Sequence, residues 1–352
     1  MNLRRAVLAL LAALFALTFP AAAAAAVYEV NSTADEADAA VGTGGCLTLG
    51  GKCTLRAAIQ ESNNSTSVKD TIDFSAAFDG QLADTIAIAL PEFPAIADEV
   101  TIDGDNGTRC ATQAGVSGPC VGVSGSAGLD VFSEDVEIKG LAVTDAGIGI
   151  AVLNESTGFT ATNNWLGVKL DGSAGANTTG IFVDPGSDFA SIGGNDAADR
   201  NVFAHNSNEG LDLEGASDAV IRGNFFGVAP DGVTQAANDK NIEVTASTAG
   251  AGFKAEDIEI GRTIEGEALT TTACNGGCNV ISGATSTGID LDGEEGNEVP
   301  AGGPITVHGN YVGLNAAGTE TIANGSFGIL VGAADNVTIG GPEYEANANF
   351  IA

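Results

Sequence analysis

The residues best placed to do chemistry are four carboxyl side chains in two copies of one short pattern. Segment 210–214 reads Gly-Leu-Asp-Leu-Glu and segment 288–292 reads Gly-Ile-Asp-Leu-Asp, which gives Asp212, Glu214, Asp290 and Asp292. In strands these residues would alternate with inward apolar residues and point outward. Together they could act as acid and base on a polysaccharide or bind calcium or carbohydrate. The simpler interpretation is a solvated acidic face that recurs with the repeat, so we assign no catalytic residue and no metal ligand.

Basic side chains give a weaker indication of chemistry. Lys139, Arg222 and His308 each precede a glycine at one position of a recurring strand pattern, whereas His205 lies in a separate segment. The chain has only two histidines and no partner motif beside them. We therefore expect no histidine-based active site, with His205 in a loop and His308 on the surface.

Aromatic residues also recur at one position of the repeat. Trp165, the pair Phe225-Phe226 and Tyr311 each follow an asparagine. As an outward stripe these rings could stack on sugars, and as inward residues they would form stacked core. Because large aromatic side chains gain most from burial, we expect them in the core.

The composition restricts the partners of the chain. A net charge of −33 disfavours nucleic acid, which needs basic patches, and anionic membrane surfaces. It suits solubility in an extracellular or salty medium, with binding of divalent cations, calcium in particular, as the alternative. Hydrophobic residues make up 44% of the chain, which argues against disorder, and its 49 glycines favour many short strands with frequent corners.

Residues 1–26 have the three parts of a signal peptide. Arg4 and Arg5 form the charged start, residues 6–19 the apolar centre, and an alanine run to Ala26 the cleavage region. No later segment approaches about 18 uninterrupted apolar residues. We therefore expect an exported chain, secreted or at the cell surface, with no membrane insertion after signal cleavage.

The six cysteines form three close pairs. In an exported chain, close pairs predict disulfides that stabilise local turns, and we expect Cys46–Cys53, Cys110–Cys120 and Cys274–Cys278. Zinc is the alternative for the last pair, but no nearby histidine or second cysteine pair completes a tetrahedral site.

From residue 86 onward the chain is a succession of short strands. A Gly-apolar-x-apolar pattern recurs, and two kinds of coil alternate, so that the repeat is two coils: 147–150, 180–183, 210–213, 241–244, 288–291 and 328–331 begin successive coils. Strands of three to five residues are too short for stable hairpin sheets, but identical coils can stack into parallel sheets at about 4.8 Å per coil. Asparagines at matching corners could stack their amides in ladders or simply form turns.

Segment 53–63 carries the one convincing helix signal after the signal peptide. It reads Cys-Thr-Leu-Arg-Ala-Ala-Ile-Gln-Glu-Ser-Asn, with Leu55 and Ile59 on one face. Thr54 can cap its start and Asn63 can end it. Since a solenoid needs its first coil covered, we assign residues 27–74 to an N-terminal cap.

The same segment resembles the CSLREA-type motif of secreted bacterial proteins that continue into pectate-lyase-like repeats. The later Gly-Ile-x-Val, Ile-Gly-Gly and Gly-Asn-aromatic-x-Gly motifs are similar to that continuation. The resemblance implies an all-β fold, a right-handed parallel β-helix solenoid with a short N-terminal helical cap. The chain then divides into a signal peptide (1–26), a cap (27–74) and the β-helix (75–352). It specifies no activity, because this fold hosts many functions.

Three functions follow from this fold. We expect first an exported, non-catalytic β-helix at the cell surface or in the medium that contacts polysaccharide or another surface. A polysaccharide lyase or glycoside hydrolase on the same fold is the rival, and a purely structural stalk is the third. The chain lacks the paired-aspartate and Gly-His-Gly signatures of pectin hydrolases and the Asp-Pro-His-Asp of alginate epimerases. That absence favours the non-catalytic function.

The chain stops in the middle of a repeat. Segment 349–351 matches 201–203 and 279–281, and both of those continue into another coil. An uncovered last coil should expose inward residues to water, namely Ile329, Val331, Val337 and Ile339. We therefore expect a truncated longer protein, a covering partner, or self-association through this end.

Overall fold

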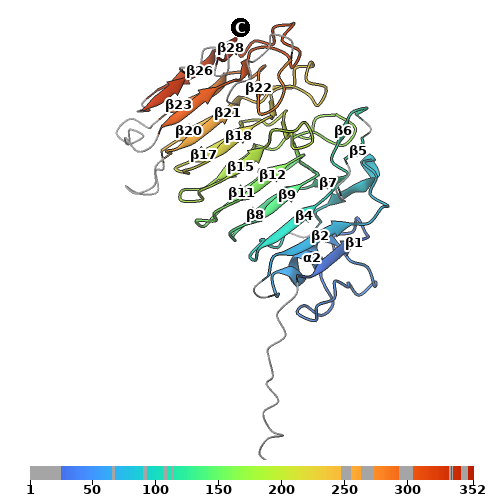
Figure 1. Ribbon diagram of the computed structural model, residues 1–352. Coiled ribbons are helices and arrows are strands. Elements are labelled where there is room, and N and C mark those ends of the chain that lie inside the picture. The colour runs from blue at the N-terminus through green and yellow to red at the C-terminus, as the bar shows by residue number, and fades with distance from the viewer. Residues whose placement is uncertain are drawn as a thin grey trace, which may run out of the picture.

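The chain is an elongated stack of coils in which parallel strands follow one another from the N-terminal to the C-terminal end (Figure 1). The computed structural model describes residues 25–65, 68–89, 93–105, 109–112, 114–246, 255–262, 273–292, 304–332, 334, 336–341 and 348–352. The predicted signal peptide lies outside these residues except for its last two positions. Three long parallel sheets form the body of the molecule, which confirms the parallel β-helix.

From β7 (Val121–Ser124) onward, successive strands belong to the nine-, seven- and ten-stranded sheets in turn, so that each full coil contributes one strand to each sheet. The ten-stranded sheet contains β1 (Val27–Val30), β2 (Asp70–Phe74), β4 (Val100–Asp103), β9 (Glu137–Lys139), β12 (Thr160–Thr162), β15 (Ser191–Gly193), β18 (Val220–Arg222), β21 (Ile258–Gly261), β24 (Ile305–His308) and β27 (Val337–Ile339). The nine-stranded sheet contains β3 (Thr85–Ala87), β7 (Val121–Ser124), β10 (Leu141–Thr144), β13 (Trp165–Leu166), β16 (Val202–Phe203), β19 (Phe225–Phe226), β22 (Val280–Ile281), β25 (Tyr311–Val312) and β28 (Phe350–Ile351).

The third long sheet has seven strands: β8 (Leu129–Val131), β11 (Ile148–Val152), β14 (Thr179–Val183), β17 (Glu209–Glu214), β20 (Lys240–Thr245), β23 (Thr287–Asp292) and β26 (Phe327–Val331). A short antiparallel pair, β5 (Cys110–Ala111) and β6 (Ser117–Gly118), stands apart from these sheets. The helical elements of the described chain are α2 (Leu55–Ser62) and the 3-10 turn η1 (Leu82–Asp84).

Like residues stack in the core from coil to coil. In the seven-stranded sheet, Ile181, Leu211, Ile242 and Ile289 pair in sequence and are fully buried. Since side chains alternate between the two faces of a strand, a shift of one residue would turn this whole row outward. The alternation of apolar and polar residues therefore fixes the register of the coils.

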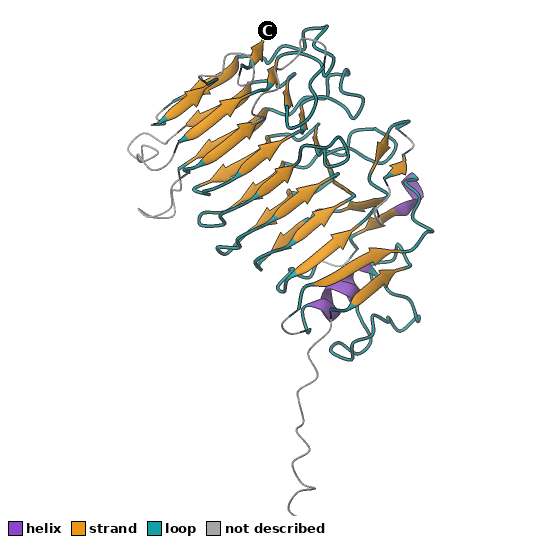
Figure 2. Ribbon diagram, in the orientation of Figure 1, coloured by secondary structure: helices purple, strands orange, loops and turns teal. Residues whose placement is uncertain are grey.

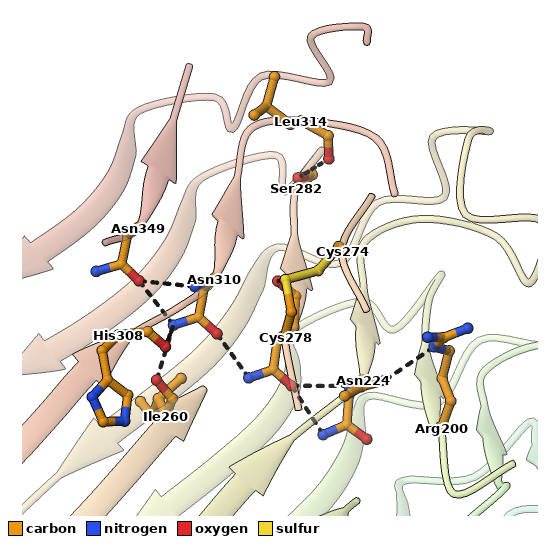
Figure 3. The surroundings of a disulfide bond; sticks show 12 residues. Arg200, Asn224, Ile260, Cys274, Cys278, Ser282, His308, Asn310, Leu314 and Asn349 are labelled. Atoms are coloured by element: carbon orange, nitrogen blue, oxygen red, sulfur yellow. Dashed lines mark hydrogen bonds between the residues drawn. A yellow bond between two sulfur atoms is a disulfide. The ribbon is translucent and has the colours of Figure 1, made fainter. Parts of the chain in front are cut away.

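Asparagine side chains form two ladders along the molecule. In the first, the Nδ2 of each asparagine donates to the Oδ1 of the next at 2.9–3.3 Å, through Asn164, Asn201, Asn224, Asn279, Asn310 and Asn349. Figure 3 shows the C-terminal part of this ladder beside the Cys274–Cys278 disulfide. The second ladder comprises Asn177, Asn206, Asn238, Asn241 and Asn324. The ladder interpretation of the corner asparagines is therefore confirmed.

Helix α2 lies at the N-terminal end of the stack, against β1 and β2 (Figure 2). Its residues Leu55 and Ile59 are buried in the main core, as expected. The Thr54 hydroxyl accepts from the amide of Ala57 at the start of the helix, and Asn63 is the C-cap, so both predicted ends are confirmed.

Two charged residues of the same segment hold the preceding loop. Nε of Arg56 lies 2.6 Å from Oδ1 of the buried Asp35. The carboxylate of Glu61 accepts the amides of Gly42 and Gly44. Both contacts join the helix to residues 35–44, so the motif acts here as a structural clamp.

All three predicted disulfides are present: Cys46–Cys53, Cys110–Cys120 and Cys274–Cys278. Of the four inward residues that we expected to be exposed in the last described coil, Ile339 and Val331 are 48% and 39% exposed, whereas Ile329 and Val337 are half-buried. Among the described residues, no helix is both long and apolar enough to cross a membrane.

Candidate functional site

The outer side of the seven-stranded sheet carries one outward residue from each coil in a continuous row. In chain order this row is Asp130, Ala151, Phe182, Asp212, Glu243, Asp290 and Leu330, and we call this side of the sheet the acidic face. Asp130 is exposed and most of the other members are half-buried, whereas Ala151 and Asp290 are buried. Parallel stacking thus aligns aromatic and carboxyl groups along the long axis of the molecule.

The predicted residues Asp212 and Asp290 share this row but lie two strands apart. Glu243 of β20 stands between them in direct register with both. Glu214 and Asp292 belong to a second row, separated in the same way by Thr245. The sequence therefore placed each predicted carboxylate on the outer face of the sheet, but it did not identify Glu243, which lies between Asp212 and Asp290.

Three carboxyl groups come together at the centre of the acidic face. One oxygen from each of Glu209, Asp212 and Glu243 lies within 4.8 Å of the others. Glu209 is buried, and its carboxylate accepts the hydroxyl of Thr179 at 2.9 Å. We call these three residues the carboxyl cluster.

Lys240 joins the carboxyl cluster to the next strand. Its ammonium pairs with Glu243 and, at 2.9 Å, with Oδ2 of Asp290. Asp290 is only 4% exposed, and its Oδ1 has no hydrogen-bond partner among the described residues. One lysine therefore balances the charge of several carboxyl groups.

Burial and crowded charge shift the protonation of the cluster. Burial, followed by the charges of Glu243, Glu209 and Glu214, raises the pKa of Asp212 to about 8. Burial also raises the pKa of Glu243, although the bond to Lys240 opposes this effect. Burial alone would lower the pKa of Lys240, but its bonds to Glu243 and Asp290 raise it overall. At neutral pH, Asp212 is thus a proton donor beside other carboxyl groups.

This arrangement has two chemical capacities. A protonated carboxyl group beside a second carboxyl group is the pair of catalytic groups that glycosidases use for general acid–base catalysis. The same three oxygen ligands could instead hold a divalent cation once Asp212 loses its proton. Because Lys240 already serves as counter-ion, a metal would have to compete with its ammonium for Glu243.

The repeat pattern marks some residues of the acidic face and leaves others unmarked. Glu243 occupies the repeat position of Asp212 and Asp290, but Asn241 replaces the preceding glycine, so the copy is less conspicuous. Glu209 and Lys240 precede the repeat motif, where no pattern marks them.

The basic residues lie on the outer side of the ten-stranded sheet and are paired there. Glu259 bonds Arg222 at 2.7 Å and Nε2 of His308 at 3.0 Å. Lys139 pairs with Asp103 at 2.9 Å. The expectation of a surface His308 is wrong, since the residue is only 8% exposed and its ring packs beside Glu259.

The recurring aromatic residues are buried, as expected, but on both sides of the nine-stranded sheet. Phe226 faces the core, where its ring stacks on Phe203 at 4.5 Å. Trp165, Phe225 and Tyr311 belong to the outward row, yet each is at most 4% exposed.

The outward rings are buried because loops fold back over them. The covering residues of the loops after β13, β19 and β25 form one apolar cluster with the rings, which includes Val168, Leu170, Val228, Ala236 and Ile322. A Cβ added at Gly232 would lie 2.8 Å from the Phe225 ring, and one at Gly318 would lie 2.9 Å from Tyr311. We call this side of the sheet the covered face.

No family model matches the chain, and no curated protein matches it.

Proposed function

We propose that this chain is an exported, non-catalytic parallel β-helix protein that binds a neutral polysaccharide along its acidic face. The observation that carries the proposal is the row from Asp130 to Leu330, which offers one outward residue per coil. Its members repeat at about 4.8 Å, a spacing comparable to the length of one sugar unit. A linear glycan lying along the molecular axis can therefore pass over one position per coil and contact those members of the row that are not buried.

The chemistry of the row favours an uncharged glycan. Phe182 offers a ring for stacking, while Asp212 and Glu243 offer carboxyl groups for hydrogen bonds to sugar hydroxyls. The net charge of −33 would repel an acidic polymer. Neutral polysaccharide at a cell surface or in the medium is thus the best-matched partner.

Export and family membership are part of the same proposal. The charged start and apolar centre of residues 1–26 support export, and three disulfides are compatible with an oxidising compartment. The clamp made by Arg56 and Glu61 gives the CSLREA-like segment a structural purpose at the first coil. These features support the proposal that the chain is related to secreted CSLREA-type β-helix proteins.

Glycoside hydrolysis is the second candidate, and the raised pKa of Asp212 favours it. Asp212 would protonate the leaving glycosidic oxygen, and Glu243 would attack the anomeric carbon. Water would then release the sugar while Asp212 takes back the proton. The close approach of the carboxyl oxygens, within 4.8 Å, suits the retaining mechanism better than the inverting one, which needs room for a water.

A screen for binding and for depolymerisation separates these functions. The purified chain would be mixed with neutral polysaccharides such as cellulose, xylan, mannan and β-1,3-glucan, with and without calcium. Binding without new reducing ends supports the proposal, and release of reducing ends that Asp212→Asn abolishes supports the hydrolase. If the chain neither binds nor cleaves any of them, the proposal fails and a structural stalk remains.

A further inference from the structure

A groove opens at the N-terminal end of the acidic face. Segment 93–97 adds one more rung beside β8, because the Ile96 amide donates to the backbone carbonyl of Asp130 and the Ile96 carbonyl accepts from the amide of Phe132, both at 2.8 Å. Helix α2 borders this rung. Between them lies a groove of about 500 Å³, whose lining includes Arg56, Gln60, Phe93, Asp130 and Phe132.

The helix end fixes one wall of this groove. Nδ2 of Asn63 donates to the carbonyl of Ala95 at 2.7 Å, and its Oδ1 accepts the amide of Ala97 at 2.8 Å. These two bonds hold the 95–97 backbone against the C-terminus of α2. The groove is therefore built jointly by the cap helix and the first rungs of the sheet.

The lining offers an aromatic surface with one donor and one acceptor. Phe132 is 41% exposed. Gln60 uses its Oε1 to accept the amide of Asp38, while its Nε2 has no partner in the described chain. Asp130 is exposed and supplies acceptor oxygens. A ring for stacking beside a donor and an acceptor matches an uncharged polyhydroxylated ligand.

Among the described residues that line the groove, the single cation, Arg56, is already engaged. Arg56 makes a two-pronged contact with Asp35, at 2.6 and 3.0 Å, and its guanidinium lies over the Phe93 ring at 5.0 Å. Its charge is therefore neutralised within the cap. This pairing disfavours an anionic ligand and leaves a neutral sugar as the better match.

We propose that this groove is a sugar-binding subsite at the N-terminal end of the acidic face, with Phe132 as its stacking platform and Gln60 and Asp130 as its hydrogen-bonding groups. The inference rests on the proposed function, because Asp130 is also the first member of the outward row. A glycan on the acidic face thus ends its contact against the cap helix. The volume suits one or two sugar units.

The test measures binding of cellohexaose, xylohexaose, mannohexaose and laminarihexaose to the whole mature chain by calorimetry. Phe132→Ala should weaken binding of the preferred hexasaccharide about fivefold to tenfold. Gln60→Glu retains the acceptor for Asp38 but removes the free donor, so it should weaken binding as well. The matched control is Phe189→Ala, because Phe189 is a similarly exposed phenylalanine, at 59%, outside the groove.

Phe182→Ala, in the middle of the row, separates the two proposals. If the unaltered chain binds and Phe182→Ala weakens binding while Phe132→Ala does not, the subsite is wrong and the proposed function stands. If Phe132→Ala and Gln60→Glu weaken binding while Phe189→Ala does not, the subsite is supported. Failure of the unaltered chain to bind any of the four sugars overturns the proposed function and the subsite together.

Discussion

The acidic face and the covered face are built by the same parallel stacking of coils, but loops cover one of them and leave the other partly open to solvent. Both are outer sides of parallel sheets, and both align one outward residue per coil. On the covered face, loops fold back over Trp165, Phe225 and Tyr311 and make a second apolar core. On the acidic face, Asp212 and Glu243 remain half-buried, with crowded charge.

An outward position in a β-helix is therefore not the same as an exposed one. The strand alternation decides only which side of the sheet a residue occupies. Loop packing then decides whether that side stabilises the fold or remains available to a ligand. We therefore expect substitutions on the covered face to affect stability and those on the acidic face to affect pH response and binding.

The largest contrast should come from two aromatic substitutions. Trp165→Ala removes a fully buried ring from the covered face and should cost about 3–5 kcal/mol of unfolding free energy. Phe182→Ala, on the half-buried acidic face, should cost about 1 kcal/mol or less. Chemical denaturation of both variants checks this, and equal costs would remove the distinction between the two faces.

A second contrast concerns the asparagine ladder that borders the covered face. Asn224 donates to the Ile192 carbonyl and to Asn279, and it accepts from Asn201. Asn224→Ala leaves buried partners unsatisfied and should cost about 2–4 kcal/mol. Asn208→Ala, at an exposed corner, is the control and should change the denaturation midpoint little. A similar small change for Asn224→Ala would mean that water replaces the ladder without loss.

The acidic face should make stability depend on pH. Because the folded state raises the pKa of Asp212 to about 8, the folded chain keeps a proton that the unfolded chain releases near pH 4. Stability should therefore fall as pH rises from about 4 to 8. Asp212→Asn should remove this loss and stabilise the chain by on the order of 2 kcal/mol at pH 8.

Melting curves from pH 4 to 9 measure this effect. The control is Asp292→Asn, at an exposed position in the second row of the same sheet. If Asp212→Asn and the unaltered chain show the same pH profile, the Asp212 carboxyl group is ionised normally in the folded chain.

The smallest expected effect is that of calcium. If the carboxyl cluster holds the ion, calcium at several times its dissociation constant should stabilise the folded chain by about 1 kcal/mol. Magnesium should do less, because it prefers a strict octahedral shell with several waters. Asp212→Asn should abolish the difference in melting temperature between the two ions. Equal small shifts with both ions would indicate only screening of charge.

The local features of this protein could be predicted from its sequence. Helix α2 with its caps, the three disulfides and the alternation that sets strand register all depend on residues close together in the chain. Repetition then extended these local rules, so that Asp212 and Asp290 could be placed in one row from their equivalent motifs.

The tertiary structure alone decided which side chains meet across coils and which outer face is covered. Glu209 and Lys240 join the acidic face although no motif marks them, and His308 is buried beside Glu259 from another coil. Trp165 and Phe225 are outward in their strands but buried, because the loops that follow β13, β19 and β25 fold back over them. The repeat pattern determines toward which side of the sheet a side chain points. Whether that side chain is buried, and which charged group it pairs with, depends on segments that the repeat does not specify.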